Sequence, residues 1–450
     1  MDLKNWKMLD LKFVDLLGNM HHITMPAENF KGKVGVDGSS LPGFTQTESG
    51  DLVIRPDEST AFPDPFLGEG VLSCLCNLHE ADTGRPYHKD PRQLARKVDT
   101  YLREEGIADA IWILPELEFY VFDAVAYQNT VNHTFYEVKS AQAHWDTAVP
   151  GYKIPHHRGY HAAPPLDSTF ILRDRITTLL RAAGIPVKYH HHEVGGAGQC
   201  EVEIAPLPFL KAADAVILAK YLIKMEALKH GKLVTFMPKP LFDEAGSGLH
   251  FHIRLEKKGQ PVFYKKGAYA DLSPLALQFM SGILVHGRAL TAFTNPSTNS
   301  FKRFVPGFEA PTSLFFSLAN RNAAIRIPKY ATSPEEKRFE YRPPDASCNP
   351  YLALSAILMA GADGVRRKLD PGKLHLGPYN SVAEAKGKLA EVPAGLLEAL
   401  DALGEDSDFL KAGGAFNEDS LRSWTEVKRK ENVELHKRPH PFEYEMYFSV

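Results

Sequence analysis

The sequence predicts an α+β protein of two domains, and two observations support this fold class. Residues 1–89 are rich in glycine, proline and β-forming residues and contain few helix signals. From residue 90 to residue 450, segments with helically spaced apolar residues alternate with short strands. Several of these strands carry charged residues two positions apart inside apolar runs, a pattern typical of one curved sheet with a charged concave face. We therefore expect a small β-rich domain at 1–89 and a larger domain at 90–450.

The composition is that of an ordinary globular protein. The chain has 450 residues, of which 44% are hydrophobic and 24% charged, and a formal net charge of -3. These values allow a large core and indicate no basic surface for nucleic acid. We expect neither a membrane helix nor a signal peptide, because no apolar run reaches about 20 residues and none follows a basic head at the start. The four cysteines form no CxxC pair, which favours a reducing cytoplasm.

The predicted elements follow in order along the chain. In the first domain we expect short strands within 11–26, 31–40 and 62–87. Asp90 can cap a helix and Pro91 suits its first turn, which places the domain boundary near Lys89. Helical spacing predicts helices within 88–106, 166–184, 210–231, 272–293 and 349–368. The tail from 421 to 450 is expected to begin as a helix and to end extended.

The stretch YHHHEVGGAGQCEVE, residues 189–203, places histidines and glutamates around a glycine-rich turn. If it is a hairpin whose turn is centred on Ala197, Glu193 lies opposite Glu201, and opposed side chains on antiparallel strands are about 5 Å apart. Two carboxylates at that distance repel by roughly 3 kcal/mol at an effective dielectric near 20, and a cation between them would reverse the sign. A different register would leave both glutamates in water, and this stretch alone does not decide between the two.

The same spacing recurs in three other strands. Charged residues two apart share one strand face in LPELEFYVF, GSGLHFHIR and KRFEYRPPD. The pairs are Glu116 with Glu118, His250 with His252, and Glu340 with Arg342. Each pair alone is more often a solvated strand face, but together they indicate a metal site. An oxygen-rich set favours Mg²⁺ or Mn²⁺ over zinc, and the absence of HExxH argues against a metalloprotease.

Arginines form a second group of candidate functional residues, namely Arg303, Arg321, Arg326, Arg338 and Arg342. Guanidinium groups bind phosphate and carboxylate oxygens two at a time, and with divalent cations they indicate phosphoryl transfer. The chain has no GxxxxGK[ST] motif, so a P-loop is excluded. NSFKRFVPGFEAP, which contains Glu309, has the composition of a lid, and VGVDGSSLPG sets Asp37 and Ser40 on a turn.

Taken together, these stretches resemble the type I glutamine synthetase family. HHHEVGGAGQCEVE, TFMPKPLF, GSGLHFH, RFVPGFEAP and the series NR…IRIP…FEYRPPD occur in the family's order across most of the chain. The resemblance implies a β-grasp domain followed by a catalytic domain with a curved antiparallel sheet flanked by helices. It also implies a dodecamer of two hexameric rings with active sites between subunits. The implied activity is an ATP-dependent ligase that makes glutamine from glutamate and ammonium through γ-glutamyl phosphate.

The resemblance also implies a role for each matching residue. One metal would be held by Glu118, Glu193 and Glu201, and a second by Glu116, His250 and Glu340. Substrate would be bound by Gly246 and by two arginines that hold its carboxylate, Arg303 and Arg342. ATP would be contacted by His252, Arg321, Arg326 and Arg338. The ammonium pocket would be formed by Asp37, Ser40, Tyr160, Glu193 and Glu309. In that mechanism Asp37 helps to take a proton from ammonium, and Glu309 closes the lid.

The chain departs from the family pattern at four positions. Ala245 stands where members usually have an asparagine that contacts the substrate amino acid, and Lys188, Arg254 and Glu335 replace residues near the nucleotide. The alternative is therefore a related ligase that joins glutamate, or a similar acid, to an amine or polyamine. A catalytically silent regulator is a different class, which the complete set of metal ligands argues against. A two-metal hydrolase would leave the arginines and the lid unexplained.

Overall fold

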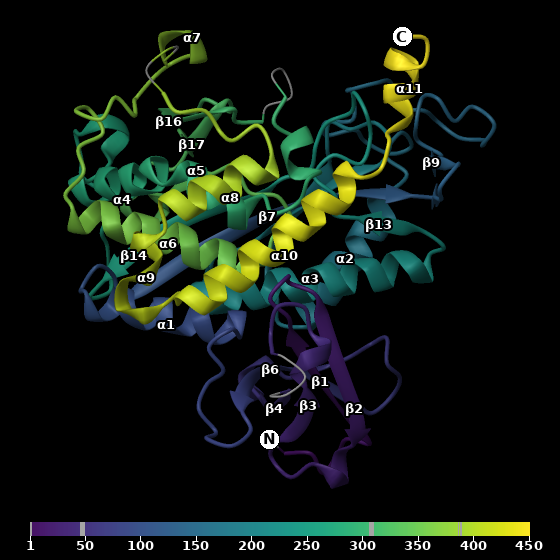
Figure 1. The fold of residues 1–450 in the computed structure, drawn as a ribbon, viewed down its shortest axis with the longest axis horizontal. Coiled ribbons are helices and arrows are strands. Elements are labelled where there is room, and N and C mark those ends of the chain that lie inside the picture. Colours follow the sequence, from purple (N-terminus) through teal and green to yellow (C-terminus); the bar gives the residue numbers. More distant parts are fainter. Residues whose placement is uncertain (1, 46–49, 306–309, 386, 388) are drawn as a thin grey trace.

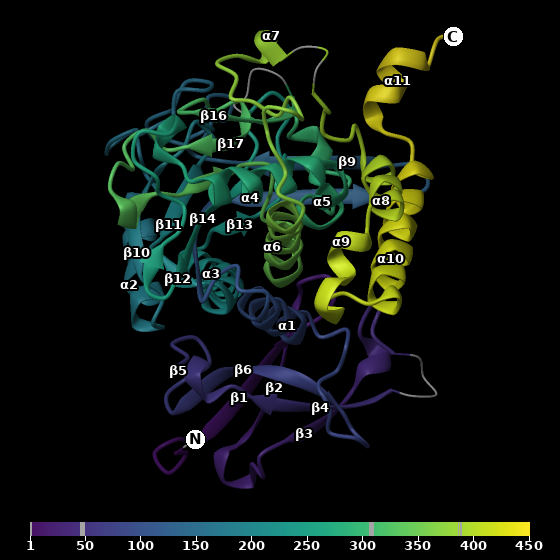
Figure 2. The same cartoon turned by 90° about the vertical axis from the view of Figure 1, so that its left-hand side faces the viewer.

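The computed structural model describes residues 2–45, 50–305, 310–385, 387 and 389–450. It has two sheets, a small one in the N-terminal part and a large one in the remainder (Figure 1). The small sheet lies against α1 (Pro91–Glu104) and α3 (Phe209–Lys229), on the side away from α7 (Val382–Ala385), and Figure 2 shows the same arrangement from the side. The predicted fold class, a small β-rich domain followed by a larger domain with a curved sheet flanked by helices, is confirmed.

The small sheet has the strand order β2-β1-β6-β4-β3, with β5 paired to β6. Its strands are β1 (Met8–Val14), β2 (Met20–Pro26), β3 (Val34–Asp37), β4 (Asp51–Pro56), β5 (Phe62–Pro63) and β6 (Val71–Glu80). The pairing of β1 with β6 is parallel and the others are antiparallel. Apolar residues on one face, such as Leu9 and Leu11, are fully buried.

The large sheet has the order β10-β11-β7-β14-β18-β17-β16, with three short strands added at the sides of β7 and β14. Its main strands are β7 (Ala110–Phe122), β10 (Val187–His192), β11 (Gln199–Ile204), β14 (Leu249–Lys257), β16 (Ser313–Leu318), β17 (Ala323–Ile327) and β18 (Phe339–Tyr341). The added strands are β12 (Leu207–Pro208), β13 (Leu233–Thr235) and β15 (Gln260–Pro261). All pairings are antiparallel except β16 with β17, which departs from the purely antiparallel sheet that we expected. A separate hairpin, β8 (Ala124–Asn129) with β9 (Thr134–Lys139), projects from the body.

Helices flank the large sheet and supply most of its core. The remaining ones are α2 (Phe170–Ala182), α4 (Pro274–Val285), α5 (Gly287–Thr294), α6 (Pro350–Arg366), α8 (Leu396–Glu405), α9 (Asp408–Lys411), α10 (Glu418–His436) and α11 (Pro441–Tyr447). α6 is buried along nearly its whole length, because its sequence is apolar on all sides. Asp90 accepts a hydrogen bond from the Arg92 amide and Pro91 is the first residue of α1, as the sequence predicted.

Two predictions about helices were wrong. The range 272–293 forms two helices, α4 and α5, which meet at His286. The end of the tail is helical and not extended, because His440 caps α11, Pro441 occupies its first turn, and the Glu443 carboxylate accepts a hydrogen bond from the His440 amide. Among the described residues, none of the helices combines the length and apolar composition that crossing a membrane requires.

Candidate active site

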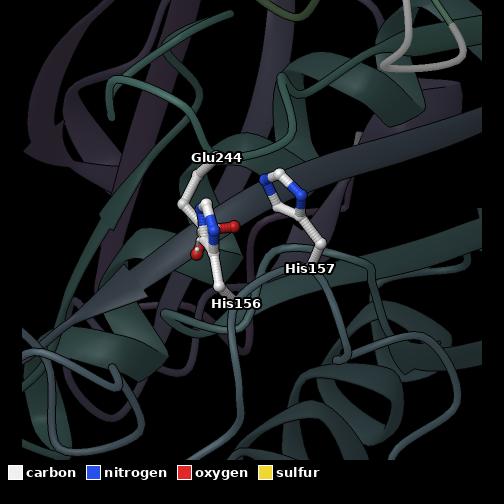
Figure 3. Close-up of side chains that lie close together, drawn as sticks. All are labelled: His156, His157 and Glu244. Carbon is white, nitrogen blue, oxygen red and sulfur yellow. Dashed lines mark ion pairs between the residues drawn. The ribbon is translucent and has the colours of Figure 1, made fainter.

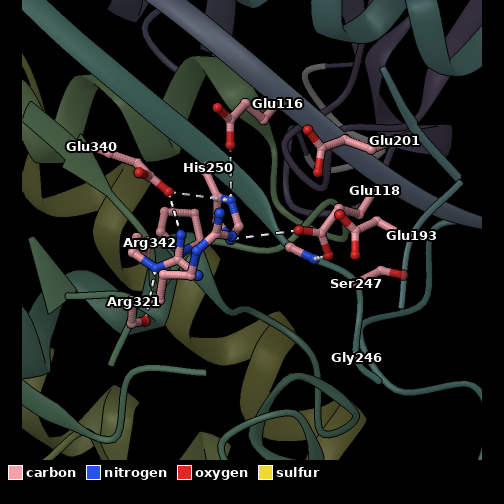
Figure 4. Close-up of polar contacts among 12 residues, drawn as sticks. Glu116, Glu118, Glu193, Glu201, Gly246, Ser247, His250, Arg321, Glu340 and Arg342 are labelled. Carbon is pink, nitrogen blue, oxygen red and sulfur yellow. Dashed lines mark hydrogen bonds and ion pairs between the residues drawn. The ribbon is translucent and has the colours of Figure 1, made fainter. Parts of the chain in front are cut away.

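The large sheet gathers acidic and basic side chains on one face because residues two apart on a strand point the same way. On β7, Glu116 and Glu118 share this face. Glu118 is paired with Glu201 of β11, and Glu116 is paired with Glu203 of β11 and with His250 of β14. Figure 4 shows the carboxylates of Glu116, Glu118 and Glu201 near one another on this face. The row continues through His252 of β14, Glu340 of β18 and Arg326 of β17, which are paired in that order.

Three groups of side chains on this face have the geometry to hold a cation. Within each group the ligand atoms lie within 4.8 Å of one another. The groups are Glu116 with His250 and Glu340, His191 with Glu193 and Glu201, and Glu116 with Glu201 and Glu203. Most of these residues are buried, and nearly all the donor atoms are carboxylate oxygens, which suits a hard divalent cation.

The register of the hairpin differs from the one predicted. His191, and not Glu193, lies opposite Glu201, so the turn is centred on Gly196. The prediction was wrong by two residues, and a shift of two keeps every side chain on the same face of the strand. Glu193 therefore still points toward Glu201, and His191 lies between them, with its Nδ1 3.8 Å from the Glu193 carboxylate and its Nε2 3.5 Å from that of Glu201.

The part of the site at Glu116 and Glu340 contains its own cations, and we call it the paired half. It consists of Glu116, His250, His252, Arg326, Glu340 and Arg342. His252 Nε2 lies 2.7 Å from Glu116 Oε1, and both Arg326 and Arg342 form ion pairs with Glu340. Burial acts to raise the pKa of Glu340, but Arg342, His252 and Arg326 outweigh it and hold that pKa at about 2. Burial also acts to raise the pKa of Glu116, but His252 and His250 outweigh it and hold that pKa well below its usual range.

The other part of the site lacks such compensation, and we call it the acidic half. It consists of Glu118, Glu193 and Glu201, together with the flanking His191. Burial and the neighbouring carboxylates of Glu118 and Glu201 raise the pKa of Glu193 well above its usual range. Burial and the carboxylates of Glu116, Glu118 and Glu203 do the same to Glu201. These carboxylates can all ionise together only if a cation enters from outside.

His250 joins the two halves. Its Nδ1 lies 3.2 Å from Glu116 Oε2, and its Nε2 lies 3.7 Å from Glu118 Oε1. Arg303 Nη2 approaches the same Nε2 at 3.2 Å, and Arg303 Nη1 donates to the Pro343 carbonyl at 2.8 Å. One imidazole thus contacts carboxylates of both halves and one of the predicted substrate arginines.

The structure brings most of the other predicted residues to this face. Arg342 Nε donates to the Arg321 carbonyl at 3.0 Å (Figure 4), and burial raises the pKa of Tyr160 while the Arg321 guanidinium opposes that rise. Gly246 packs against Arg303, where a Cβ would come within 2.7 Å of the Arg303 side chain. Arg338 stands at the start of β18, over the Tyr330 ring at 5.5 Å.

Three predicted residues are not placed at this face. Asp37 and Ser40 lie at the end of β3 in the small sheet, where the Asp37 carboxylate accepts from the Ser39 amide and from the Ser40 hydroxyl at 2.9 Å. Glu309 lies outside the described residues. Within one chain, the site therefore holds neither Asp37 nor Ser40.

Sequence reasoning missed Glu203 and His191 as members of the site. Both were visible in principle, because Glu203 has the same strand parity as Glu201, and His191 the same parity as Glu193. The departures from the family pattern also have partners that the sequence did not reveal. Lys188 Nζ lies 2.6 Å from the buried Glu203 carboxylate, and Arg254 donates to the Glu335 carbonyl.

The Ala245 segment contributes main-chain groups to the wall of the site. The Tyr120 hydroxyl donates to the Ala245 carbonyl at 2.7 Å, and Gln199 Nε2 donates to the Gly246 carbonyl at 3.0 Å. Both donors are buried residues of the large sheet. The backbone here is fixed even though the methyl side chain of Ala245 makes no hydrogen bond.

Comparison with known proteins places this arrangement in context. Residues 5–81 match the family model described as the glutamine synthetase beta-Grasp domain, and residues 88–447 match the glutamine synthetase catalytic domain. The chain is 44% identical to glutamine synthetase of Aquifex aeolicus, covering 98% of this chain and 96% of that protein. It is also 44% identical to glutamine synthetase of Streptomyces coelicolor, covering 99% and 96%. Among solved structures, the Plasmodium falciparum glutamine synthetase superposes with a TM-score of 0.90 at 28% identity, covering 99% of this chain and 96% of that chain. GmaS without ligand superposes with a TM-score of 0.82 at 26% identity, covering 99% and 98%.

Proposed function

The chain belongs to the glutamine synthetase family, and we propose that the charged face of its large sheet is where it makes glutamine from glutamate and ammonium at the expense of ATP. It is a glutamate–ammonia ligase. The observation that carries the assignment of the site is the convergence of carboxylates, histidines and arginines from five strands on one buried face. A face of this composition suits a reaction in which negative charge accumulates on transferring phosphate.

The donor set fits divalent cations. In this proposal Glu118, Glu193 and Glu201 hold one cation, and Glu116, His250 and Glu340 hold a second. The oxygen-rich set favours Mg²⁺ or Mn²⁺. Such cations neutralise phosphate charge and polarise the γ-phosphoryl group of ATP when bound. The raised pKa values of Glu193 and Glu201 support the first assignment, because uncompensated carboxylates indicate a missing positive charge.

Different side chains would serve the two chemical steps, phosphoryl transfer and attack by ammonia. Arg303 and Arg342 bind the carboxylate of glutamate beside Gly246, while Arg321, Arg326, Arg338 and His252 face ATP. A side-chain carboxylate oxygen of glutamate attacks the γ-phosphorus, the bond to ADP breaks, and γ-glutamyl phosphate forms. Asp37 accepts a proton from ammonium in a pocket completed by Ser40, Tyr160, Glu193 and Glu309. The resulting ammonia attacks the acyl carbon, phosphate leaves with the bridging oxygen, and the departing phosphate takes up the proton that the nitrogen loses. A lid that carries Glu309 would exclude water, which otherwise hydrolyses acyl phosphates.

The distance of Asp37 from the large sheet supports assembly into an oligomer. Asp37 and Ser40 belong to the small sheet, so a second copy of the chain has to supply them to each site. A dodecamer of two hexameric rings meets this need, and two exposed apolar segments are suited to subunit contacts. One is α11 with Phe442, Tyr444 and Phe448, and the other is the β8–β9 hairpin with Tyr127 and Tyr136. A cytoplasmic location is consistent with four buried free cysteines.

The test is an assay of the purified protein with ATP, glutamate, Mg²⁺ and either ammonium or a panel of small amines and polyamines, with products identified by mass. Glutamine as the main product is the expected result. A γ-glutamyl amide would assign the chain to the alternative amine-using ligase, which Ala245 motivates because it offers no side-chain hydrogen bond. Absence of any glutamate-dependent phosphate release would refute glutamine synthesis and would leave only a ligase that uses a similar acid in place of glutamate.

A further inference from the structure

A second group of potential metal ligands lies outside the charged face. It consists of His156 and His157, on the segment between β9 and α2, and Glu244, on the segment that precedes β14. Their ligand atoms lie within 4.8 Å of one another. In Figure 3 the two histidines approach from one side and Glu244 from the other, so that three side chains from two segments converge. None of them belongs to the paired or the acidic half.

Glu244 is the member whose burial demands an explanation. Its side chain is 1% exposed, and among the described residues neither carboxylate oxygen has a hydrogen-bond partner. His156 Nε2 lies 3.6 Å from Glu244 Oε1, which is beyond hydrogen-bond distance. A buried carboxylate without hydrogen bonds costs several kcal/mol unless it is neutralised. Burial also raises the pKa of Glu244, against the opposing effect of His156 and His157.

The two histidines are held in an orientation that suits ligation. Consecutive side chains of an extended chain point to opposite sides, but His157 has a left-handed backbone with φ of 58° and its ring lies 3.7 Å from that of His156 between centroids. His157 Nε2 lies against the Asp243 carbonyl. When that nitrogen donates its proton, the lone pair of a neutral ring is on Nδ1. A backbone carbonyl that orients the second ring nitrogen is the usual environment of a histidine metal ligand.

We propose that His156, His157 and Glu244 form a binding site for a divalent transition cation, with Zn²⁺ the best match. Two imidazoles and one carboxylate are a donor set that zinc takes with bonds of about 2.0–2.1 Å, and such tetrahedral donors stand about 3.4 Å apart. The 3.6 Å between His156 Nε2 and Glu244 Oε1 is close to that separation. The exposed His157 provides access from solvent for the ion and for a water as the fourth ligand.

The site would connect two walls of the proposed substrate pocket. His156 and His157 precede Tyr160 on one wall, and Glu244 precedes Gly246 on the other. A bound ion would fix the separation of these segments without entering the phosphoryl-transfer chemistry. Its existence does not depend on which acid or amine the enzyme uses.

The test is titration of the full-length protein with Co²⁺ in the presence of excess Mg²⁺, which occupies the carboxylate sites. Four-coordinate Co²⁺ absorbs visible light far more strongly than octahedral Co²⁺, so a site with two histidines and a glutamate is distinguishable from the oxygen-rich sites. We expect one strongly absorbing Co²⁺ per chain, displaced by one equivalent of Zn²⁺. Glu244→Gln and His157→Asn should each weaken it roughly 100-fold or more, since they remove a ligand outright.

The control is His230→Asn. His230 directly follows α3 and its Nε2 lies 3.0 Å from Glu226 Oε1, and it is not one of the three proposed ligands. This variant should leave the absorption band unchanged. Thermal unfolding of each variant verifies that it is folded. Because His157 is exposed, its substitution should not destabilise the fold. A wild-type protein without the band would overturn the proposal and leave Glu244 as a plain partner of His156. A band that survives in both ligand variants would overturn it as well.

Discussion

The paired half and the acidic half of the site use the same kind of ligand but balance its charge differently. In the paired half, Arg326 and Arg342 form ion pairs with Glu340, whose pKa is held at about 2, and His250 and His252 act to lower the pKa of Glu116. In the acidic half, burial and mutual repulsion raise the pKa values of Glu193 and Glu201. The paired half is therefore stable before any cation binds. In the acidic half the repulsion is relieved either by protonation or by an external cation, so metal binding and folding stability should be coupled mainly there.

The largest expected effect tests the paired half. Glu340→Gln leaves the buried guanidinium groups of Arg326 and Arg342 without their anion. Removing one partner of a buried ion pair costs about 3–5 kcal/mol, so the free energy of unfolding in EDTA should fall by that amount and synthesis should be lost. Urea unfolding measures the change. Glu398→Gln, which breaks an exposed pair with Arg288, is the control and should cost less than about 1 kcal/mol. Equal losses for the two variants would contradict the paired half as defined.

The second largest expected effect is the rise in the free energy of unfolding when Mg²⁺ binds. Mg²⁺ at about 100 times its dissociation constant should raise the free energy of unfolding of the wild type by roughly 2.7 kcal/mol, because it binds only the folded state. Glu193→Gln should remove more of this stabilisation than His250→Asn does, since the repulsion that raises the pKa of Glu193 is what the cation relieves. Thermal unfolding with and without Mg²⁺ gives both differences. A larger loss for the histidine variant would reverse the comparison.

The third prediction is a gain in the free energy of unfolding of the metal-free protein, where the first is a loss. Glu201→Gln should stabilise the metal-free protein by about 1–2 kcal/mol, because it removes one of several buried carboxylates that repel one another. The same variant should lose glutamine synthesis, since a ligand is missing. Unfolding in EDTA measures the stability and product formation measures the activity. A destabilised metal-free variant would show that the acidic half is compensated in a way the structure does not reveal.

Much of this site could be predicted from the sequence, because residues two apart on a strand share a face whatever the exact register of the strand. Glu116 with Glu118 and His250 with His252 were assigned to one face from spacing alone, and the two-residue error in the hairpin register left Glu193 and Glu201 on the same side. The division into halves was not predictable, because it depends on which strands are neighbours, such as β17 and β18 bringing Arg326 to Glu340. The proposed role of Asp37 was not visible from strand parity, because in the proposed oligomer it would reach the site from another copy of the chain. The helical end of the tail was missed because the capping role of His440 was not recognised.

The smallest expected effect concerns Lys188, the departure from the family pattern that pairs with Glu203, whose carboxylate acts on the pKa of Glu201 in the acidic half. Its Nζ lies 2.6 Å from the buried Glu203 carboxylate and 4.8 Å from the centre of the Tyr189 ring, and its side chain is 35% exposed. Lys188→Met keeps the apolar stem and removes the charge. Because solvent screens this pair, the metal-free protein should lose only about 0.5–1 kcal/mol.

Removing that charge should also make the acidic half a stronger cation site. The Mg²⁺ dissociation constant of Lys188→Met, measured by calorimetry, should fall about 3–5-fold, the equivalent of roughly 1 kcal/mol. Lys211→Met, which changes an exposed lysine of α3, is the matched control and should alter neither quantity. Weaker Mg²⁺ binding in Lys188→Met would mean that Lys188 supports the ligand geometry of Glu203 instead of competing with the cation. In that case Lys188 would act as an internal cation beside the acidic half, and the two halves would differ only in how much of their carboxylate charge the chain itself compensates.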